Sequence, residues 1–140
     1  MNFYGLAALA VVMAGMSSCG GTKSAVCENE SPITANVVSA TSSNGSAAGL
    51  LFLKHKLPIA SGEEVKIVWR VTGEGPLSLR YFDPSGAERP LTFGPAEHLG
   101  SSFNRPGDEW GGGFQFDAKG CWHIRLDRTG TSADAWLAVR

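Results

Sequence analysis

The segment from Glu64 to Thr72 constrains the fold more than any other part of the chain, because its side chains alternate between apolar and polar. The positions on its apolar side are Val65, Ile67, Trp69 and Val71. The positions on its other side are Lys66, Val68 and Arg70. Successive side chains of a strand point to opposite faces, so this period of two predicts a β-strand with one buried and one largely hydrated face. A chain built around such a strand must form a sheet.

Shorter segments repeat this signal, and residues that favour turns separate them. We expect strands or strand-like segments at residues 33–41, 50–57, 77–82, 89–93, 114–116, 121–127 and 133–139. We expect a turn or flexible loop at residues 42–49 and a long surface loop at residues 94–113, where Gly, Pro and Ser gather. No stretch has a sustained helical period. With 18 glycines and 43% hydrophobic residues for a core, the pattern predicts an all-β fold, an antiparallel β-sandwich.

The first residues indicate export. An unbroken apolar run from Leu6 to Met16 is followed by Ser17-Ser18-Cys19-Gly20-Gly21. The run is too short to cross a bilayer comfortably and fits the hydrophobic region of a secretory signal. A cysteine directly after two small residues resembles the lipobox of bacterial lipoproteins, which implies cleavage before Cys19 and lipid on its thiol and new amino group. Two acyl signals on one residue give stable anchoring, whereas a single chain gives only marginal binding.

Two features depart from that pattern and leave alternatives open. Residues 1–5 contain no Lys or Arg, and Met16 stands where a lipobox has leucine or another aliphatic residue. The alternatives are an ordinary cleaved signal, in which Cys19 is incidental, and an uncleaved short anchor. Under the lipoprotein interpretation, residues 1–18 are the signal peptide, residues 19–32 are the lipidated cysteine with a polar tether, and residues 33–140 are the folded domain.

The chain has three cysteines, an odd number for an exported protein. Lipid on Cys19 removes this difficulty, because Cys27 and Cys121 then remain as a pair that an oxidising compartment lets join in a disulfide. The alternative is two buried free thiols. Since Cys-x-x-Cys is absent, neither a redox motif nor a zinc ribbon is supported.

Residues 116–124, Phe-Asp-Ala-Lys-Gly-Cys-Trp-His-Ile, resemble the entry into the penultimate strand of bacterial immunoglobulin-like domains. The wider stretch from Pro106 to Val139 is similar to small bacterial lipoproteins that end in this way. The resemblance covers roughly the last third of the chain. It implies an immunoglobulin-like β-sandwich in an extracytoplasmic, membrane-anchored lipoprotein, and it brings no activity and no catalytic residues to this sequence.

The run Gly120-Cys121-Trp122 has a structural interpretation. Neighbouring residues of a strand point to opposite faces, so Trp122 shares its side with Ile124, whereas Cys121 faces the other way. Cys121 and Trp122 therefore do not line one pocket together. In antibody domains a buried tryptophan on another strand packs against the disulfide, and Trp69 is the candidate for that role here.

The expected long loop carries the candidate binding residues. They are Phe103, Arg105, Asp108, Glu109 and Trp110. Functional residues often lie on loops that a rigid sandwich holds, and Trp110 could stack on a sugar ring or on a side chain of a partner. In the alternative, Trp110 folds back to cap the open end of the core, and Gly111-Gly112-Gly113 let the chain turn sharply into Phe114.

The composition and the motifs exclude some functions. A net charge of −1 provides no field to attract nucleic acid, and the motifs of α/β-hydrolases, zinc proteases, P-loop proteins and EF-hands are absent. We therefore assign no catalytic residue, no metal ligand and no cofactor. The leading hypothesis is a lipid-anchored, extracytoplasmic binding or structural protein of the cell envelope, with a protein or glycan partner. The alternative is a metal-handling accessory or hydrolase-like enzyme that uses His98, Asp108, Glu109 and His123.

Overall fold

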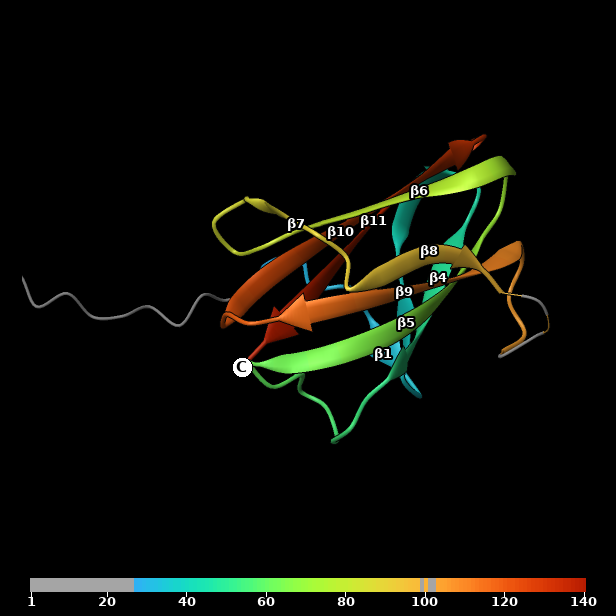
Figure 1. The fold of residues 1–140 in the computed structure, drawn as a ribbon. Helices are drawn as coiled ribbons and strands as arrows, with labels where there is room; N and C mark the ends of the chain where they lie inside the picture. Colours follow the sequence, from blue (N-terminus) through green and yellow to red (C-terminus); the bar gives the residue numbers. More distant parts are fainter. Residues whose placement is uncertain (1–26, 99, 101–102) are drawn as a thin grey trace, which may run out of the picture.

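The structure, a computed structural model, describes residues 27–98, 100 and 103–140. The expected signal peptide and Cys19 lie outside the described residues. The described residues form strands and no helix (Figure 1). In chain order, the strands are β1 (Ile33–Thr34), β2 (Val37–Ser39), β3 (Thr41–Asn44), β4 (Ala47–Phe52), β5 (Glu63–Val71), β6 (Glu74–Phe82), β7 (Glu88–Arg89), β8 (Phe93–Glu97), β9 (Asp108–Phe116), β10 (Gly120–Thr129) and β11 (Thr131–Val139).

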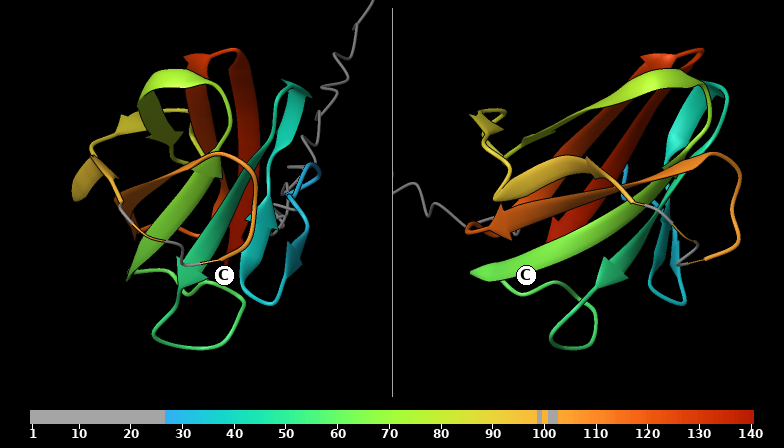
Figure 2. Two further views of the ribbon diagram at one scale, coloured as in Figure 1. Left: turned by 90° about the vertical axis from the view of Figure 1, so that its right-hand side faces the viewer. Right: turned by 45° about the vertical axis from the view of Figure 1, so that its right-hand side comes forward.

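These strands form two antiparallel sheets that pack against each other (Figure 2). The larger sheet has six strands in the order β1–β2–β4–β5–β9–β8. The smaller sheet has five strands in the order β3–β11–β10–β6–β7. The expected all-β architecture with two packed antiparallel sheets is confirmed.

Strand β5 lies almost where the alternating segment predicts it, at Glu63–Val71. Its inward side chains are all fully buried: Val65, Ile67, Trp69 and Val71. Val68 points to the opposite face and is buried as well, although a hydrated face is expected there. In the sheet register Val68 lies between Leu50 of β4 and Gly111 of β9, so the outer face of the larger sheet is apolar at this point.

The expected surface loop at residues 94–113 is wrong. The region contains most of β8 and the first two thirds of β9, and the three glycines 111–113 lie extended inside β9. A Cβ on Gly112 would lie 2.8 Å from Cδ2 of Leu79, and one on Gly113 would lie 2.4 Å from Cδ1 of Phe93. These glycines therefore allow neighbouring side chains to approach the strand closely. In the sequence alone, glycines with this role look the same as glycines of a turn.

The expected turn or loop at residues 42–49 is wrong for most of its length. Strand β3 covers Thr41–Asn44, and β4 begins at Ala47 and ends at Phe52, before the end of the strand expected at residues 50–57. The small residues of β4 belong to the core packing, because Gly49 is paired directly with Trp69 of β5. A Cβ on Gly49 would lie 2.8 Å from two ring atoms of Trp69.

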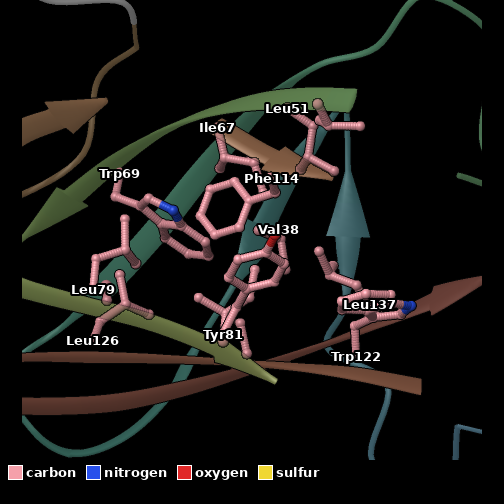
Figure 3. Close-up of a cluster of buried hydrophobic side chains, with 14 of the residues drawn as sticks. Val38, Leu51, Ile67, Trp69, Leu79, Tyr81, Phe114, Trp122, Leu126 and Leu137 are labelled. Atoms are coloured by element: carbon pink, nitrogen blue, oxygen red, sulfur yellow. The ribbon is translucent and has the colours of Figure 1, made fainter. Parts of the chain in front are cut away.

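Aromatic side chains from both sheets meet in the centre of the core (Figure 3). Tyr81 of β6 packs edge-to-face on Phe114 of β9, with ring centres 5.1 Å apart, and stacks on Trp122 of β10 at 5.6 Å. The Tyr81 hydroxyl donates to the carbonyl of Pro90 at 3.1 Å and accepts from the amide of Gln115 at 3.3 Å. Burial raises the pKa of this phenol. The ring thus joins the two sheets while its polar atom keeps hydrogen-bond partners.

Cys27 and Cys121 form the expected disulfide, with Cα atoms 4.9 Å apart. The bond lies on the outer face of the smaller sheet, because Cys121 alternates with the buried Trp122. The expectation that Trp69 packs against it is therefore wrong, since Trp69 points into the core from the larger sheet. The reason is the strand period, which gives adjacent residues opposite faces.

Residues 27–32, expected as the end of the tether, are held on the smaller sheet. The amide of Ser31 donates to the carbonyl of Trp136 at 2.9 Å, and the amide of Trp136 donates to the Ser31 hydroxyl at 2.9 Å. Ser31 is buried by this contact. The disulfide at Cys27 and the hydrogen bonds at Ser31 therefore fix the start of the described chain at two points.

We predict that Gly49→Ala destabilises the protein by about 1–3 kcal/mol, because the new methyl group would overlap the buried ring of Trp69. Gly111→Ala in β9 of the same sheet is the matched control, since the nearest atoms to a Cβ there are 3.9 Å away. Urea denaturation of both variants measures the difference. Equal stability of the two variants would contradict the packing described for Trp69.

We also predict that the double variant Cys27→Ser, Cys121→Ser unfolds with a free energy lower by up to about 4 kcal/mol. The two cysteines are 94 residues apart, so the bond removes much of the freedom of the unfolded chain. Denaturation of the wild type with and without a reducing agent provides the comparison. Wild-type stability that does not change on reduction would show that the bond contributes nothing.

Candidate functional site

The residues of the expected binding loop do not form a common surface. Phe103 is half-buried and Arg105 is exposed, both between β8 and β9. Asp108 and Glu109 begin β9 and point to opposite faces of the larger sheet. The Asp108 carboxylate lies 2.9 Å from the guanidinium of Arg128, whereas the Glu109 side chain is 2% exposed on the outer face.

Trp110 lies in the core, and its residue is 9% exposed. The guanidinium of Arg128 lies 5.5 Å from the centre of its ring and donates to the carbonyl of Val71 at 2.7 Å. Trp110 therefore closes one end of the core beneath Arg128, and its ring is not presented for stacking on a ligand. The following glycines continue the strand and make no sharp turn, which corrects that part of the capping alternative.

Of the four residues of the enzyme or metal hypothesis, only His98 and Glu109 come together. His98 Nδ1 is 3.0 Å from Glu109 Oε2, and Arg70 Nε is 3.3 Å from Oε1 of the same carboxylate. Asp108 points to the other face of β9, and His123 lies on the outer face of the other sheet. Within the described ranges, no three His, Cys, Asp or Glu side chains are grouped to hold a metal ion.

The smaller sheet brings together three aromatic residues, of which only His123 is a candidate site residue in the sequence, in the enzyme or metal hypothesis. Phe82 of β6, His123 of β10 and Trp136 of β11 are paired directly across neighbouring strands. Their rings are nearly parallel: the His123 ring centre lies 4.1 Å from that of Trp136 and 5.4 Å from that of Phe82. All three are half-buried on the outer face. They form a row of stacked rings across the strands, here called the aromatic row.

A network of charged groups lies beside the aromatic row. The Asp134 carboxylate accepts from Nη1 of Arg125 at 2.7 Å and lies 2.7 Å from Nε2 of His123. Arg125 Nε donates to Asp127 at 3.0 Å and Nη2 donates to the Ser132 hydroxyl at 2.9 Å. The Ser132 hydroxyl in turn donates to Asp127. Each member holds its neighbour in place, so the side chains that surround the aromatic row are fixed before any ligand arrives.

The network shifts the acidity of its members in opposite directions. The hydrogen bond from Ser132, and then the contact with Arg125, lower the pKa of Asp127. The hydrogen bonds to Asp127 and Asp134 raise the pKa of Arg125. Both charged forms are therefore favoured by the fold.

Two adjoining hollows share the residues His123, Asp134 and Trp136. The first has a volume of about 360 Å³ and extends past Phe82 to the turn at Pro84. The second has a volume of about 540 Å³ and extends past Thr41 of β3 to Asn29 and Glu30. We call the two hollows together the transverse groove, because they cross the smaller sheet from β6 to β3.

The N-terminal segment forms one wall of the transverse groove. Asn29 and Glu30 line the second hollow, and Cys121 lines the first. The disulfide from Cys121 to Cys27 therefore joins the floor of the groove to its wall. The geometry offers stacking surfaces, fixed hydrogen-bond donors and fixed acceptors in one concave place, which are the components of a small-ligand or polymer binding site.

One sequence signal could have pointed to this face. In the alternating segment at residues 133–139, Trp136 falls on the side of Asp134, opposite to Ala133, Ala135 and Leu137. A large aromatic residue on the hydrated side of a strand invites a search for its neighbours. Its neighbour His123 is found only through the register of β10 and β11.

The part of the chain that the structure describes has no helix of the length and apolarity that a membrane span needs. Comparisons of the chain with protein-family models, with curated proteins and with solved structures found no match.

We predict that Asp127→Asn lowers the free energy of unfolding at neutral pH by about 1 kcal/mol. The variant should also lose less stability than the wild type when the pH is lowered. The fold lowers the pKa of Asp127. Its contribution to the free energy of unfolding is therefore fully present above the pKa of the unfolded chain and is lost as the pH falls through the pKa of the folded protein. Denaturation curves between neutral pH and about pH 2 measure this. Glu88→Gln on β7, an exposed position, is the control. An acid profile unchanged by Asp127→Asn would show that the network does not stabilise the sheet.

Proposed function

We propose that this chain is a lipid-anchored, extracytoplasmic binding protein of the cell envelope, and that the transverse groove is its ligand site. The observation that carries the proposal is the aromatic row of Phe82, His123 and Trp136, held beside a closed network of charged side chains. Stacked rings and fixed polar groups gathered in a hollow are the components of a ligand site. The enzyme or metal-handling alternative lacks such support, because only His98 and Glu109 of its four residues are in contact, and Asp108 and His123 lie on other faces.

The order of the strands supports the immunoglobulin-like type of sandwich. In that fold, strands A, B, E and D form one sheet, and strands C, F and G form the other. Strands A to G correspond in chain order to β4, β5, β6, β8, β9, β10 and β11. The neighbours in the larger sheet, β4–β5–β9–β8, then match A–B–E–D, and those in the smaller sheet, β6–β10–β11, match C–F–G, with β7 as an additional strand beside β6. Two features differ from antibody domains: β1, β2 and β3 are added at the start, and the disulfide lies on an outer face instead of joining the sheets.

The position of the disulfide suits anchoring through Cys19. Cys19 precedes Cys27 by eight residues, so a fully extended chain between them spans at most about 28 Å. Cys27 is bonded to Cys121 at the groove. Lipid on Cys19 would therefore hold the transverse groove close to the membrane surface, where components of the envelope are abundant.

We predict that the chain, extracted with detergent from the membranes of a bacterial host, begins at Cys19 and carries acyl groups there. Mass spectrometry of the N-terminal peptide measures the added mass, and Cys19→Ala should remove it. An unmodified chain in the soluble fraction would contradict the anchor.

A second experiment tests the groove. The extracted full chain is mixed with isolated envelope fragments and sedimented. Trp136→Ala should lower the sedimenting fraction, and Phe52→Ala, an exposed aromatic on the larger sheet, should not. Equal sedimentation of both variants would contradict the groove as the ligand site.

A further inference from the structure

We infer that the transverse groove binds an uncharged, linear glycan that lies across the strands of the smaller sheet. This inference rests on the proposed function, since it names the class of ligand for the same site. Four features of the groove carry it: the partly exposed aromatic ring, the mixture of fixed donors and acceptors, the lack of positive excess charge, and the pairing of the strand edges along the groove.

Trp136 provides the stacking surface. The chain has four tryptophans; Trp69, Trp110 and Trp122 are buried in the core, whereas Trp136 lines both hollows. One face of its ring is stacked on His123, with ring planes 10° apart, so the ring is held in one orientation. Sugar rings present flat faces of C–H groups, which pack on rigid aromatic surfaces and lose little conformational freedom there.

The polar groups of the groove match hydroxyl groups. A sugar hydroxyl both donates and accepts, so it needs acceptors and donors close together. Asp134 supplies carboxylate oxygens and Arg125 supplies guanidinium N–H groups, 2.7 Å apart and both on the wall of the first hollow. Their mutual hydrogen bond fixes the spacing of the two, so a ligand does not have to order them.

The charges along the groove show no positive excess. Two arginines, Arg80 and Arg125, and two aspartates, Asp83 and Asp134, line the first hollow, and Glu30 lines the second. A polyanion such as a nucleic acid or a phosphate polymer requires an excess of Lys and Arg along its path. The lining instead has one more acidic than basic side chain, which argues against a polyanion and is compatible with an uncharged ligand.

Where the groove crosses them, the strands are paired on both sides. Strand β10 lies between β6 and β11, β6 is paired with β7 at Tyr81 and Phe82, and the outer side of β11 is paired with β3 up to Asp134 and with Ser31 at Trp136. A peptide that binds as an added strand needs an unpaired edge for its backbone hydrogen bonds, and the groove does not offer one along its course. The distance from β6 to β3 is three strand spacings, about 14 Å. This length suits a chain of several sugar units better than a single sugar.

The test is a titration of the detergent-extracted full chain with β-1,4-linked glucose and N-acetylglucosamine oligomers, from monomer to hexamer. Because the other three tryptophans are buried, acrylamide quenching of tryptophan fluorescence reports mainly on Trp136. A bound glycan should reduce this quenching. Affinity from calorimetry should rise at least about tenfold from the monomer to the longer oligomers, as more of the groove is filled.

Variants locate the site and separate folding from binding. Trp136→Ala should weaken the affinity about tenfold or more, Trp136→Phe should restore part of it, and Phe52→Ala should leave it unchanged. Thermal unfolding of each variant shows that it is folded. Equal affinity of Trp136→Ala and Phe52→Ala would overturn the assignment of glycan binding to the groove.

Further outcomes distinguish this inference from the proposed function. If no oligomer binds or changes the quenching, but Trp136→Ala still lowers sedimentation with envelope fragments, the glycan class is overturned and the binding groove stands. The glycan class is also overturned, and the binding groove stands, if envelope peptides reduce the acrylamide quenching of Trp136 and glycans do not. If uronic-acid oligomers of equal length bind more tightly than the neutral ones, the uncharged class is overturned. If Trp136→Ala affects neither assay, the proposed function fails together with the inference.

Discussion

The alternation of side chains along β10 places the core on one side of the smaller sheet and the chemistry of the transverse groove on the other. Trp122, Ile124 and Leu126 are fully buried, and between them Cys121, His123, Arg125 and Asp127 point outward. A shift of the register by one residue would exchange the two sets. Burial of the inward set therefore fixes the position of every outward group, including the sulfur that binds Cys27. The groove does not need its own source of stability, because the core holds its floor in place.

The parts of the fold that the sequence predicts well are those where one local period decides the outcome. Strand β5 and the faces of β10 follow from alternation, and the pairing of Cys27 with Cys121 is what the hypothesis of lipid on Cys19 predicts. The aromatic row could not be predicted in this way. Phe82, His123 and Trp136 come from three strands, and only the register of those strands makes them neighbours. Register depends on the fit of whole strands, which a local pattern does not contain.

The failure at residues 94–113 has a different physical cause. Glycine permits turns, and it also permits close approach to an extended strand, so three glycines in succession do not reveal which use applies. Here Phe93 lies against Gly113 from the outer side and Leu79 lies against Gly112 from the core. The same strand carries Trp110 into the core beneath Arg128, whereas the sequence places it in a loop. Trp110, expected to bind a ligand, thus closes the end of the core, and the candidate site lies on the opposite sheet.

The covalent link between Cys27 and Cys121 also determines how a mechanical load would enter the domain. Tension on the chain ahead of Cys27 passes through the sulfur atoms into β10, a strand that is flanked by β11 and β6. The weaker hydrogen bonds between Ser31 and Trp136 lie beyond this point and are shielded from the pull. A domain attached in this way could be dragged by its leading segment while the wall of its groove keeps its shape.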